Sequence, residues 1–107
     1  MDTAVIPESL LEEAARRFAL LGDASRLRIL RTLLESDEVS VGELADVTGL
    51  TRTNLSQHLS RLAAAGVVGR RREGTIVYYR IADESLGALC DLVCKSLRQR
   101  GKALAFS

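Results

Sequence analysis

The chain has 107 residues, of which 47% are hydrophobic and 27% are charged, and it contains a single proline. This length suits one domain with a modest core, and the composition excludes disordered, collagen-like and low-complexity proteins. No apolar run approaches the ~18 residues that span a bilayer, and the N-terminus lacks the basic and apolar regions of a signal peptide. We therefore expect a cytoplasmic protein that makes no membrane contact.

The net charge of +1 hides an uneven distribution of charge along the chain. Residues 1–50 carry five basic and ten acidic side chains, whereas residues 51–80 carry six basic side chains and one acid, Glu73. Windows of this length also fluctuate in charge by chance. A basic central segment beside an acidic half nevertheless favours one face for a polyanion.

The first half of the chain predicts three helices. Ser9 and Glu12 have the spacing of a capping box, so we expect a helix from Ser9 to Gly22. Its apolar stripe consists of Leu10, Leu11, Ala14, Ala15, Phe18 and Leu21. Asp23 is a good cap for a second, core helix, whose apolar residues are Leu27, Ile29, Leu30, Leu33 and Leu34. Ser40 forms a second capping box with Glu43 and begins a short helix that ends at Gly49.

A fourth helix is predicted over residues 52–65. Thr51 is a good N-cap residue, and Leu55, Leu59 and Leu62 recur at helical spacing before Gly66. Two short helices joined by a tight turn at Gly49 and Leu50 have the layout of a helix-turn-helix unit.

The sequence changes character after Gly66. The stretch VVGRRREGTIVYYRI has β-branched and aromatic residues on both sides of Gly74, which predicts a β-hairpin. Asp83 or Ser85 then begins a long closing helix with an apolar stripe of Leu86, Leu89, Cys90, Val93, Cys94 and Leu97. We expect one mainly α-helical domain over residues 1–107, a winged helix-turn-helix of order α-α-α-α-β-β-α, with short tails at 1–8 and 101–107.

The outer face of the fourth helix has the chemistry of a DNA-reading surface. It consists of Thr51, Arg52, Thr53, Asn54, Ser56, Gln57, Ser60 and Arg61, and no acid occurs between residues 51 and 72. Asn and Gln pair with adenine, Arg pairs with guanine, and Ser and Thr reach phosphate oxygens. The alternative is an ordinary solvated helix that happens to lack acids.

Three arginines of the hairpin, Arg70, Arg71 and Arg72, are further candidates for DNA contact. A wing places such side chains near phosphates or an adjacent minor groove. Neighbouring residues of a strand point to opposite faces, so the three cannot all touch DNA at once. The alternative is a solvated edge strand that its charges protect from aggregation.

Enzymatic activity is not expected. His58 is the only histidine, and because it lies between Leu55 and Leu59 we interpret it as a structural, partly buried residue. The sequence has no Gly-rich phosphate loop, no supported carboxylate pair and no local nucleophile and base arrangement.

Three segments resemble the ArsR/SmtB family of bacterial winged-helix repressors: LGDASRLRILRTLL, ELADVTGLTRTNLSQHLSRLAAAGVV and REGTIVYYRI. The resemblance covers roughly residues 10–97, and it places His58 in the recognition-helix pattern of the family. It implies a homodimer, joined through the first and last helices, that binds double-stranded operator DNA and leaves it when an inducer is sensed. A dimer also presents two recognition helices about 34 Å apart, one turn of DNA.

The inducer sites that the family is known for do not map well onto this chain. The corresponding positions hold Ser40, Val41 and Gly42 in the metal box, Asp83, Ser85, Ser96 and Gln99 in the zinc site of the last helix, Arg61 and Ala65 in the cadmium and lead site, and Arg31 in the persulfide pair. Of these ligands only the aspartate remains.

Cys90 and Cys94 are the remaining candidates for an inducer site. Their spacing places both on one helix face with Cβ atoms about 6 Å apart, which exceeds the reach of about 4.5 Å of a relaxed disulfide. Two free thiolates can instead hold a soft ion such as arsenite, cadmium or zinc, or react with sulfur species or oxidants. Equally, cysteine packs in cores as a small hydrophobe, which would place the effector site elsewhere.

A function of a different class also stays open. The same scaffold can act as a protein-interaction or dimerisation module, because fold does not dictate function. Such a module would tolerate loss of the polar face of the fourth helix.

Overall fold

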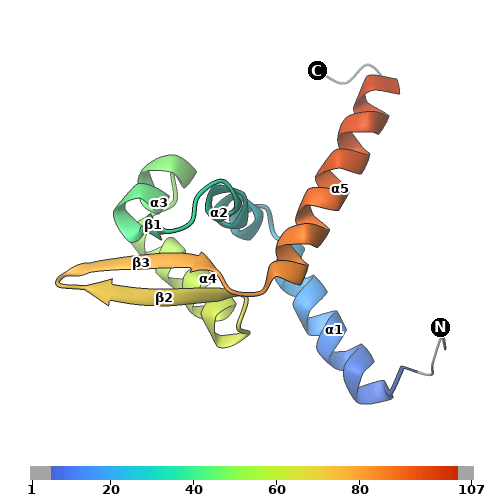
Figure 1. Cartoon of the computed structure of the whole chain (residues 1–107), viewed down its shortest axis with the longest axis horizontal. Helices are drawn as coiled ribbons and strands as arrows, with labels where there is room; N and C mark the ends of the chain where they lie inside the picture. The colour runs from blue at the N-terminus through green and yellow to red at the C-terminus, as the bar shows by residue number, and fades with distance from the viewer. Residues whose placement is uncertain (1–5, 104–107) are drawn as a thin grey trace.

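The computed structural model describes residues 6–103 and shows a winged helix-turn-helix (Figure 1). Its elements in chain order are α1 (Glu8–Leu21), α2 (Ala24–Leu34), β1 (Val39–Ser40), α3 (Val41–Thr48), α4 (Arg52–Ala64), β2 (Val68–Glu73), β3 (Ile76–Ile81) and α5 (Glu84–Ala103). The predicted fold class is confirmed, and the short strand β1 is an addition to it.

Local capping chemistry sets the start of three helices, as the sequence predicts. A side-chain oxygen accepts a hydrogen bond from a backbone N–H of the first turn at Asp23 (Arg26 N, 2.9 Å), Ser40 (Glu43 N, 3.2 Å) and Thr51 (Asn54 N, 3.1 Å). Gly49 ends α3 with a φ of 73°, a left-handed conformation that other residues adopt at a cost. These boundaries fix the turn that leads into α4.

The two ends of the chain differ from the prediction. The capping box expected at Ser9 is wrong, because α1 begins at Glu8 and its N-cap residue is Pro7, which makes no side-chain cap bond. The carbonyl of Pro7 accepts hydrogen bonds from the first turn instead, and the fixed φ of proline suits this position. At the other end α5 includes residues 101–103, which we had expected in the tail. The rest of both tails, residues 1–5 and 104–107, lies outside the described residues.

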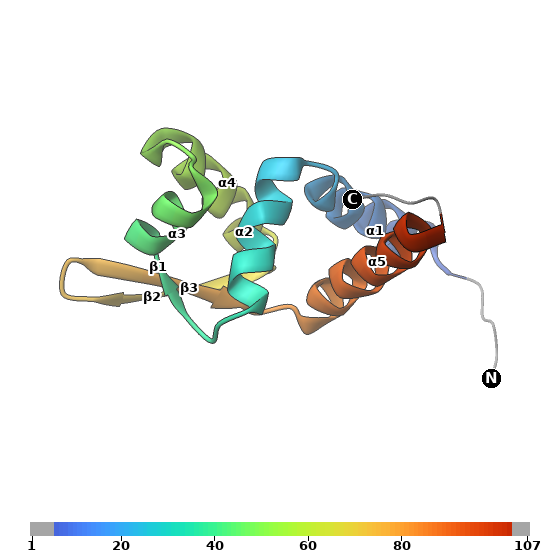
Figure 2. The same cartoon turned by 90° about the horizontal axis from the view of Figure 1, so that it is seen from above.

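The strands form one antiparallel sheet in the order β1-β3-β2. Strand β1 pairs with β3 only at Val39↔Tyr79 and Ser40↔Tyr78, whereas β2 and β3 pair over their whole length. The hairpin therefore extends beyond the three-stranded part as a two-stranded wing (Figures 1 and 2).

The core lies between α2, α3, α4 and one face of the sheet. Its largest fully buried side chains are Ile29, Leu30, Leu33, Leu44, Leu55, Leu59, Leu62 and Val67. Figures 1 and 2 show α1 and α5 projecting from the end of this body that is opposite the wing. No helix in the described range is long and apolar enough to cross a bilayer.

Candidate nucleic-acid interface

The polar face of α4 is exposed along its whole length. Leu55, Leu59 and Leu62 are buried at 1% exposure or less and fasten the helix to the core. All eight predicted side chains lie on the opposite, exposed side: Thr51, Arg52, Thr53, Asn54, Ser56, Gln57, Ser60 and Arg61. The amides of Asn54 and Gln57 are therefore free to meet an external partner.

The turn before α4 holds it at a defined angle to α3. Gly49 N donates to Ala45 O at 3.0 Å, and Leu50 N donates to the hydroxyl of Thr48 at 3.3 Å. The first bond satisfies a carbonyl in the last turn of α3, and the second satisfies the backbone N–H of the residue after Gly49. The segment from α3 to α4 is thus a rigid helix-turn-helix that presents the polar face of α4.

The wing places two of its arginines on the same side as α4. Paired residues of an antiparallel sheet share a face, and Arg70 is paired with the buried core residue Tyr79. Arg72, two residues further along β2, shares that face and donates from Nε to the carbonyl of Gly74 at 3.2 Å. Both residues are exposed, and their strand β2 packs beside α4.

Arg71 points to the opposite face of the sheet, as strand alternation requires. There its guanidinium forms ion pairs with Glu38 at 2.8 Å and Glu73 at 3.0 Å, and it lies 4.6 Å from the centre of the Tyr78 ring. Hydrogen bonds from Arg71 hold the pKa of Glu38 below its usual value, and the two carboxylates raise the pKa of Arg71. The guanidinium of Arg71 is therefore engaged on the face opposite α4, and the expectation that the wing contacts DNA rests on Arg70 and Arg72.

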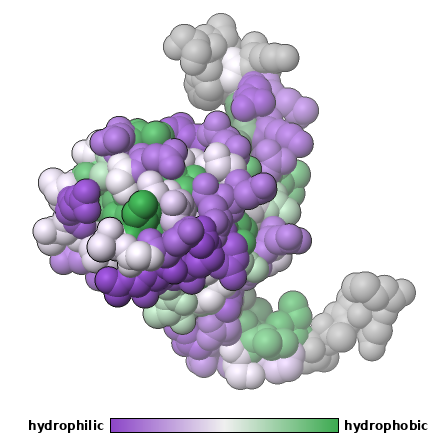
Figure 3. Space-filling model, turned by 60° about the vertical axis from the view of Figure 1, so that its left-hand side comes forward, coloured by the Kyte–Doolittle hydropathy of each residue, from purple (hydrophilic) through white to green (hydrophobic). Residues whose placement is uncertain are grey.

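A groove lies between the start of α3, Arg52 of α4 and the tip of the wing. It is lined by Ser40, Val41 and Gly42 at the start of α3, by Arg52 of α4, and by residues 75–77 of the wing. Figure 3 shows that the forward face of this part of the molecule is largely hydrophilic. A negatively charged backbone following this face would meet Arg52 on one side and the wing on the other.

His58 has the structural environment that the sequence predicted. It is half-buried, and its Nδ1 lies 3.5 Å from Nη1 of Arg26. Nε of Arg26 also donates to the carbonyl of Leu20 at the end of α1, at 2.7 Å. Within residues 6–103 no group of three or more His, Cys, Asp or Glu side chains is placed to hold a metal ion.

The two cysteines occupy different environments on α5. Cys90 is half-buried and packs against the core, whereas Cys94 is exposed, and both are free thiols. Burial raises the pKa of the Cys90 thiol, and the neighbouring Cys94 raises it further. Cys90 is therefore less ionised at neutral pH than a free cysteine. Packing in the core explains the presence of a cysteine at position 90 but not at the exposed position 94.

The helices α1 and α5 carry large apolar side chains that no other residue between 6 and 103 covers. Those exposed by 46–65% are Leu10, Leu11, Phe18, Leu92, Val93 and Leu97. In Figure 3 such apolar patches are visible on the projecting helix α1. Except for Leu92, these side chains belong to the apolar stripes that the sequence predicts for the first and last helices. Exposed apolar faces of this kind are typical of surfaces that contact another molecule.

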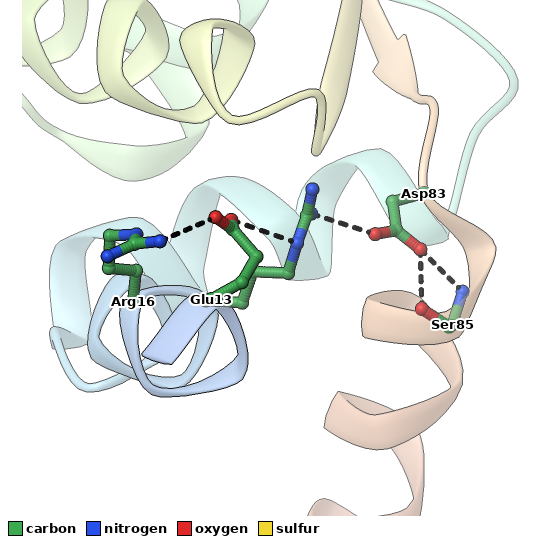
Figure 4. A network of polar contacts seen from close by, with 5 residues as sticks. Glu13, Arg16, Asp83 and Ser85 are labelled. Atoms are coloured by element: carbon green, nitrogen blue, oxygen red, sulfur yellow. Dashed lines mark hydrogen bonds and ion pairs between the residues drawn. The ribbon is translucent and has the colours of Figure 1, made fainter. Parts of the chain in front are cut away.

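A chain of polar contacts joins α1 to the start of α5 (Figure 4). Arg17 Nη1 lies 3.0 Å from Asp83 Oδ2, and Glu13 contacts both Arg16 and Arg17. Asp83 also accepts hydrogen bonds from the backbone and hydroxyl of Ser85, which lower the pKa of its carboxyl group. The contacts therefore tie α1 to the segment at the base of α5, from which the two helices diverge (Figure 1).

Comparison with known proteins gives consistent matches over most of the chain. A family model described as a helix-turn-helix domain matches residues 21–71. The arsenical resistance operon repressor of Bacillus subtilis is 31% identical over 94 residues, which are 87% of this chain and 90% of that protein. Two relatives from Mycobacterium tuberculosis, 40% and 42% identical, are longer, and the chain spans 55% and 37% of their lengths.

Solved structures match the fold closely. The solution NMR structure of the homodimeric winged helix-turn-helix DNA-binding domain of Mb0332 from Mycobacterium bovis, a possible ArsR-family regulator, has a TM-score of 0.79 at 36% identity. It covers 94% of this chain, which in turn covers 93% of it. The crystal structure of the AntR antimony-specific transcriptional repressor has a TM-score of 0.86 at 26% identity, over 95% of this chain and 92% of AntR. These proteins are transcriptional regulators and not enzymes, in agreement with the expectation from the sequence.

Proposed function

The chain belongs to the ArsR/SmtB family of winged helix-turn-helix transcriptional regulators, and from this premise we propose that it is a cytoplasmic repressor of transcription. In this proposal a homodimer binds operator DNA through α4 and the wing. An inducer acting at Cys90 and Cys94 releases it. The observation that carries the DNA-binding part is the exposed, acid-free face of α4 beside Arg70 and Arg72.

The charges of this face lead to a quantitative expectation for affinity. Each protomer would bring Arg52, Arg61, Arg70 and Arg72 to the DNA, and a dimer would bring twice as many. Eight neutralised phosphates correspond to a slope of log affinity against log salt of about −7. Affinity would then fall roughly 10⁴-fold between 50 and 200 mM salt.

The uncovered apolar faces of α1 and α5 support the homodimer. Leu92 and Phe18 are 65% and 59% exposed, and a second copy of the same chain offers a matching apolar surface. The homodimeric domain of Mb0332 shows that a related chain assembles in pairs. Pairing would also place two α4 helices for two half-sites of a palindrome.

The cysteine pair is the best candidate for the inducer site in the described chain. Cys94 is exposed and Cys90 is one turn away, so a soft ion could bridge the two sulfur atoms. AntR and the Bacillus subtilis protein are repressors for antimony and arsenical resistance, which supports arsenite or a related metalloid among the candidates, with cadmium and zinc. Since one chain brings two sulfurs, further ligands would come from solvent or a second copy.

The DNA-binding proposal is tested by selecting duplexes from a random pool with the purified protein and then measuring the affinity of the protein for the selected duplex. We expect the double variant Arg52→Ala, Gln57→Ala to bind at least about 100-fold more weakly, because a lost bidentate base contact costs about 1–3 kcal/mol in each half-site. Arg98→Ala is the matched control, since it removes one exposed charge from α5 far from α4 (Figure 1). Selection of no duplex, or unchanged affinity in the double variant, would count against the proposal.

The sensing proposal is tested by adding arsenite, cadmium, zinc or a persulfide donor to the complex of reduced protein and DNA. At least one reagent should release the wild-type protein, while Cys90→Ser and Cys94→Ser bind DNA normally and stay bound. A metal must displace the Cys90 proton, so its apparent affinity should rise with pH. Normal release of both serine variants would leave the cysteines as packing residues with the effector site elsewhere.

A further inference from the structure

The backbone alone does not fix the direction of the wing. Strand β1 supports β3 only at Tyr78 and Tyr79, and from Arg72 to Val77 the hairpin has two strands. A two-stranded hairpin is marginally stable by itself and free to twist. Arg70 pairs with Tyr79 in the three-stranded part, whereas Arg72 pairs with Val77 beyond it. Whatever holds the strands at the point where β1 ends therefore controls where Arg72 points.

Arg71 lies at this point and connects β2, across β3, to Glu38, the residue just before β1. Its Nε and Nη2 donate to the two carboxylate oxygens of Glu38 at 2.8 and 2.9 Å, while its Nη1 donates to Glu73 at 3.0 Å. Because β3 lies between β1 and β2, the guanidinium must cross the middle strand to reach Glu38, and it does so over the Tyr78 ring. The contact connects residues 33 positions apart in the chain.

We propose that Glu38 and Arg71 are positioning residues for DNA binding. Their bidentate contact across the sheet, which we call the brace, fixes the direction of the two-stranded part of the wing so that Arg72 faces DNA together with Arg70 and α4. The inference rests on the proposed DNA-binding function and deepens it. Neither Glu38 nor Arg71 touches DNA in this scheme, and both act through the wing.

The geometry of the brace distinguishes it from ordinary surface ion pairs. An isolated exposed pair contributes little, but a bidentate arginine–carboxylate contact within a network restricts geometry as well as adding energy. The guanidinium of Arg71 is occupied by two carboxylates and a ring, on the face opposite to α4. The negative charge of Glu38 at the base of a DNA-binding wing lowers the affinity for DNA. Its contact with Arg71 gives this carboxylate a structural role that offsets the loss.

The direction in which Glu38→Gln changes the affinity for DNA tests this inference. Glu38→Gln removes a negative charge, which by electrostatics alone would strengthen binding to the duplex selected by the wild-type protein. The brace predicts instead that Glu38→Gln weakens binding about tenfold, as expected when a charged phosphate contact is lost. Asp37→Asn is the matched control, because Asp37 is exposed and forms no ion pair within residues 6–103. It should bind as the wild type does or more tightly.

A double-mutant cycle shows whether Glu38 acts through Arg72. Arg72→Ala should weaken DNA binding by the wild-type protein about tenfold but binding by the Glu38→Gln protein by less than about twofold, because the misdirected wing has already lost that contact. Arg71→Lys keeps the charge but not the fork geometry, so it should behave like Glu38→Gln. Circular dichroism should show all variants folded, since the brace is exposed.

The outcomes separate this inference from the function on which it rests. Equal or tighter binding by Glu38→Gln, full binding by Arg71→Lys, or additive losses in the cycle would each overturn the brace while the wild-type protein still binds DNA. Failure of the wild-type protein to select any duplex would overturn the proposed function, and the brace with it.

Discussion

Phe18 of α1 offers the sharpest test of how the chain assembles. Its ring is 59% exposed, although it lies on the apolar stripe of α1. If a second copy covers this face, Phe18→Ala should weaken the dimer and leave the fold of each protomer unchanged. A deep core residue would show the opposite behaviour, with loss of stability before loss of assembly.

The size of the effect follows from the exposed area. A phenylalanine side chain has about 200 Å² to bury, and 59% of it is roughly 120 Å². At about 25 cal/mol per Å² its complete burial contributes about 3 kcal/mol in each protomer. Alanine keeps part of this contact, so Phe18→Ala in both protomers should cost about 4 kcal/mol of dimerisation free energy. This loss corresponds to a roughly 1000-fold higher dissociation constant of the dimer.

Sedimentation velocity over a range of protein concentrations measures this constant, and circular dichroism monitors the fold. Val47→Ala is a suitable control because Val47 is 62% exposed but lies on α3, away from α1 and α5. It should leave the dimer unchanged. A wild-type protein that is monomeric at high micromolar concentration, or a Phe18→Ala protein with an unchanged dissociation constant, would refute the argument.

Three further predictions concern stability. Leu59→Ala should lower the free energy of unfolding by about 3 kcal/mol in urea titrations, because the leucine is buried where α4 meets the core. Thr51→Ala removes the cap bond to Asn54 N and should cost about 1 kcal/mol in the same assay. The pKa of Glu38 is lowered in the folded protein, so its stabilising effect is present at neutral pH and lost as the pH falls below about 4. The melting temperature of Glu38→Gln should therefore fall less between pH 6 and pH 3 than that of the wild type, and an equal fall would contradict this assignment.

Sequence reasoning succeeded where structure is decided by a few neighbouring residues. The caps Asp23, Ser40 and Thr51 each bond a backbone group three positions away, so their signal is contained in a window of four residues. The buried face of α4 likewise follows from the 3.6-residue period of its leucines. The same period separates its polar side chains from the core, which is why all eight were correctly placed on the surface.

The features that the sequence did not reveal depend on long-range pairing. Strand β1 has only two residues and exists because Val39 meets Tyr79, 40 positions away. The partner of Arg71 is equally remote, and alternation alone could say only that neighbouring arginines point apart. Ser9 shows the opposite kind of error. The local sequence predicted a helix cap at Ser9, but α1 begins earlier and its N-cap residue is Pro7.

One connection between α5 and α4 is short and runs through a single buried residue, Val67. The backbone carbonyl of buried Val67 accepts hydrogen bonds from Ala82 N at 2.9 Å and Asp83 N at 3.1 Å, just before α5, while Val67 N donates to Leu62 O at the end of α4. One buried residue thus joins the start of α5 to the end of α4. Packed cores transmit small displacements as rigid shifts because they have little free volume to absorb them. A displacement of α5 by chemistry at its cysteines would therefore reach the recognition helix without an intervening flexible linker, as release of DNA by such chemistry requires.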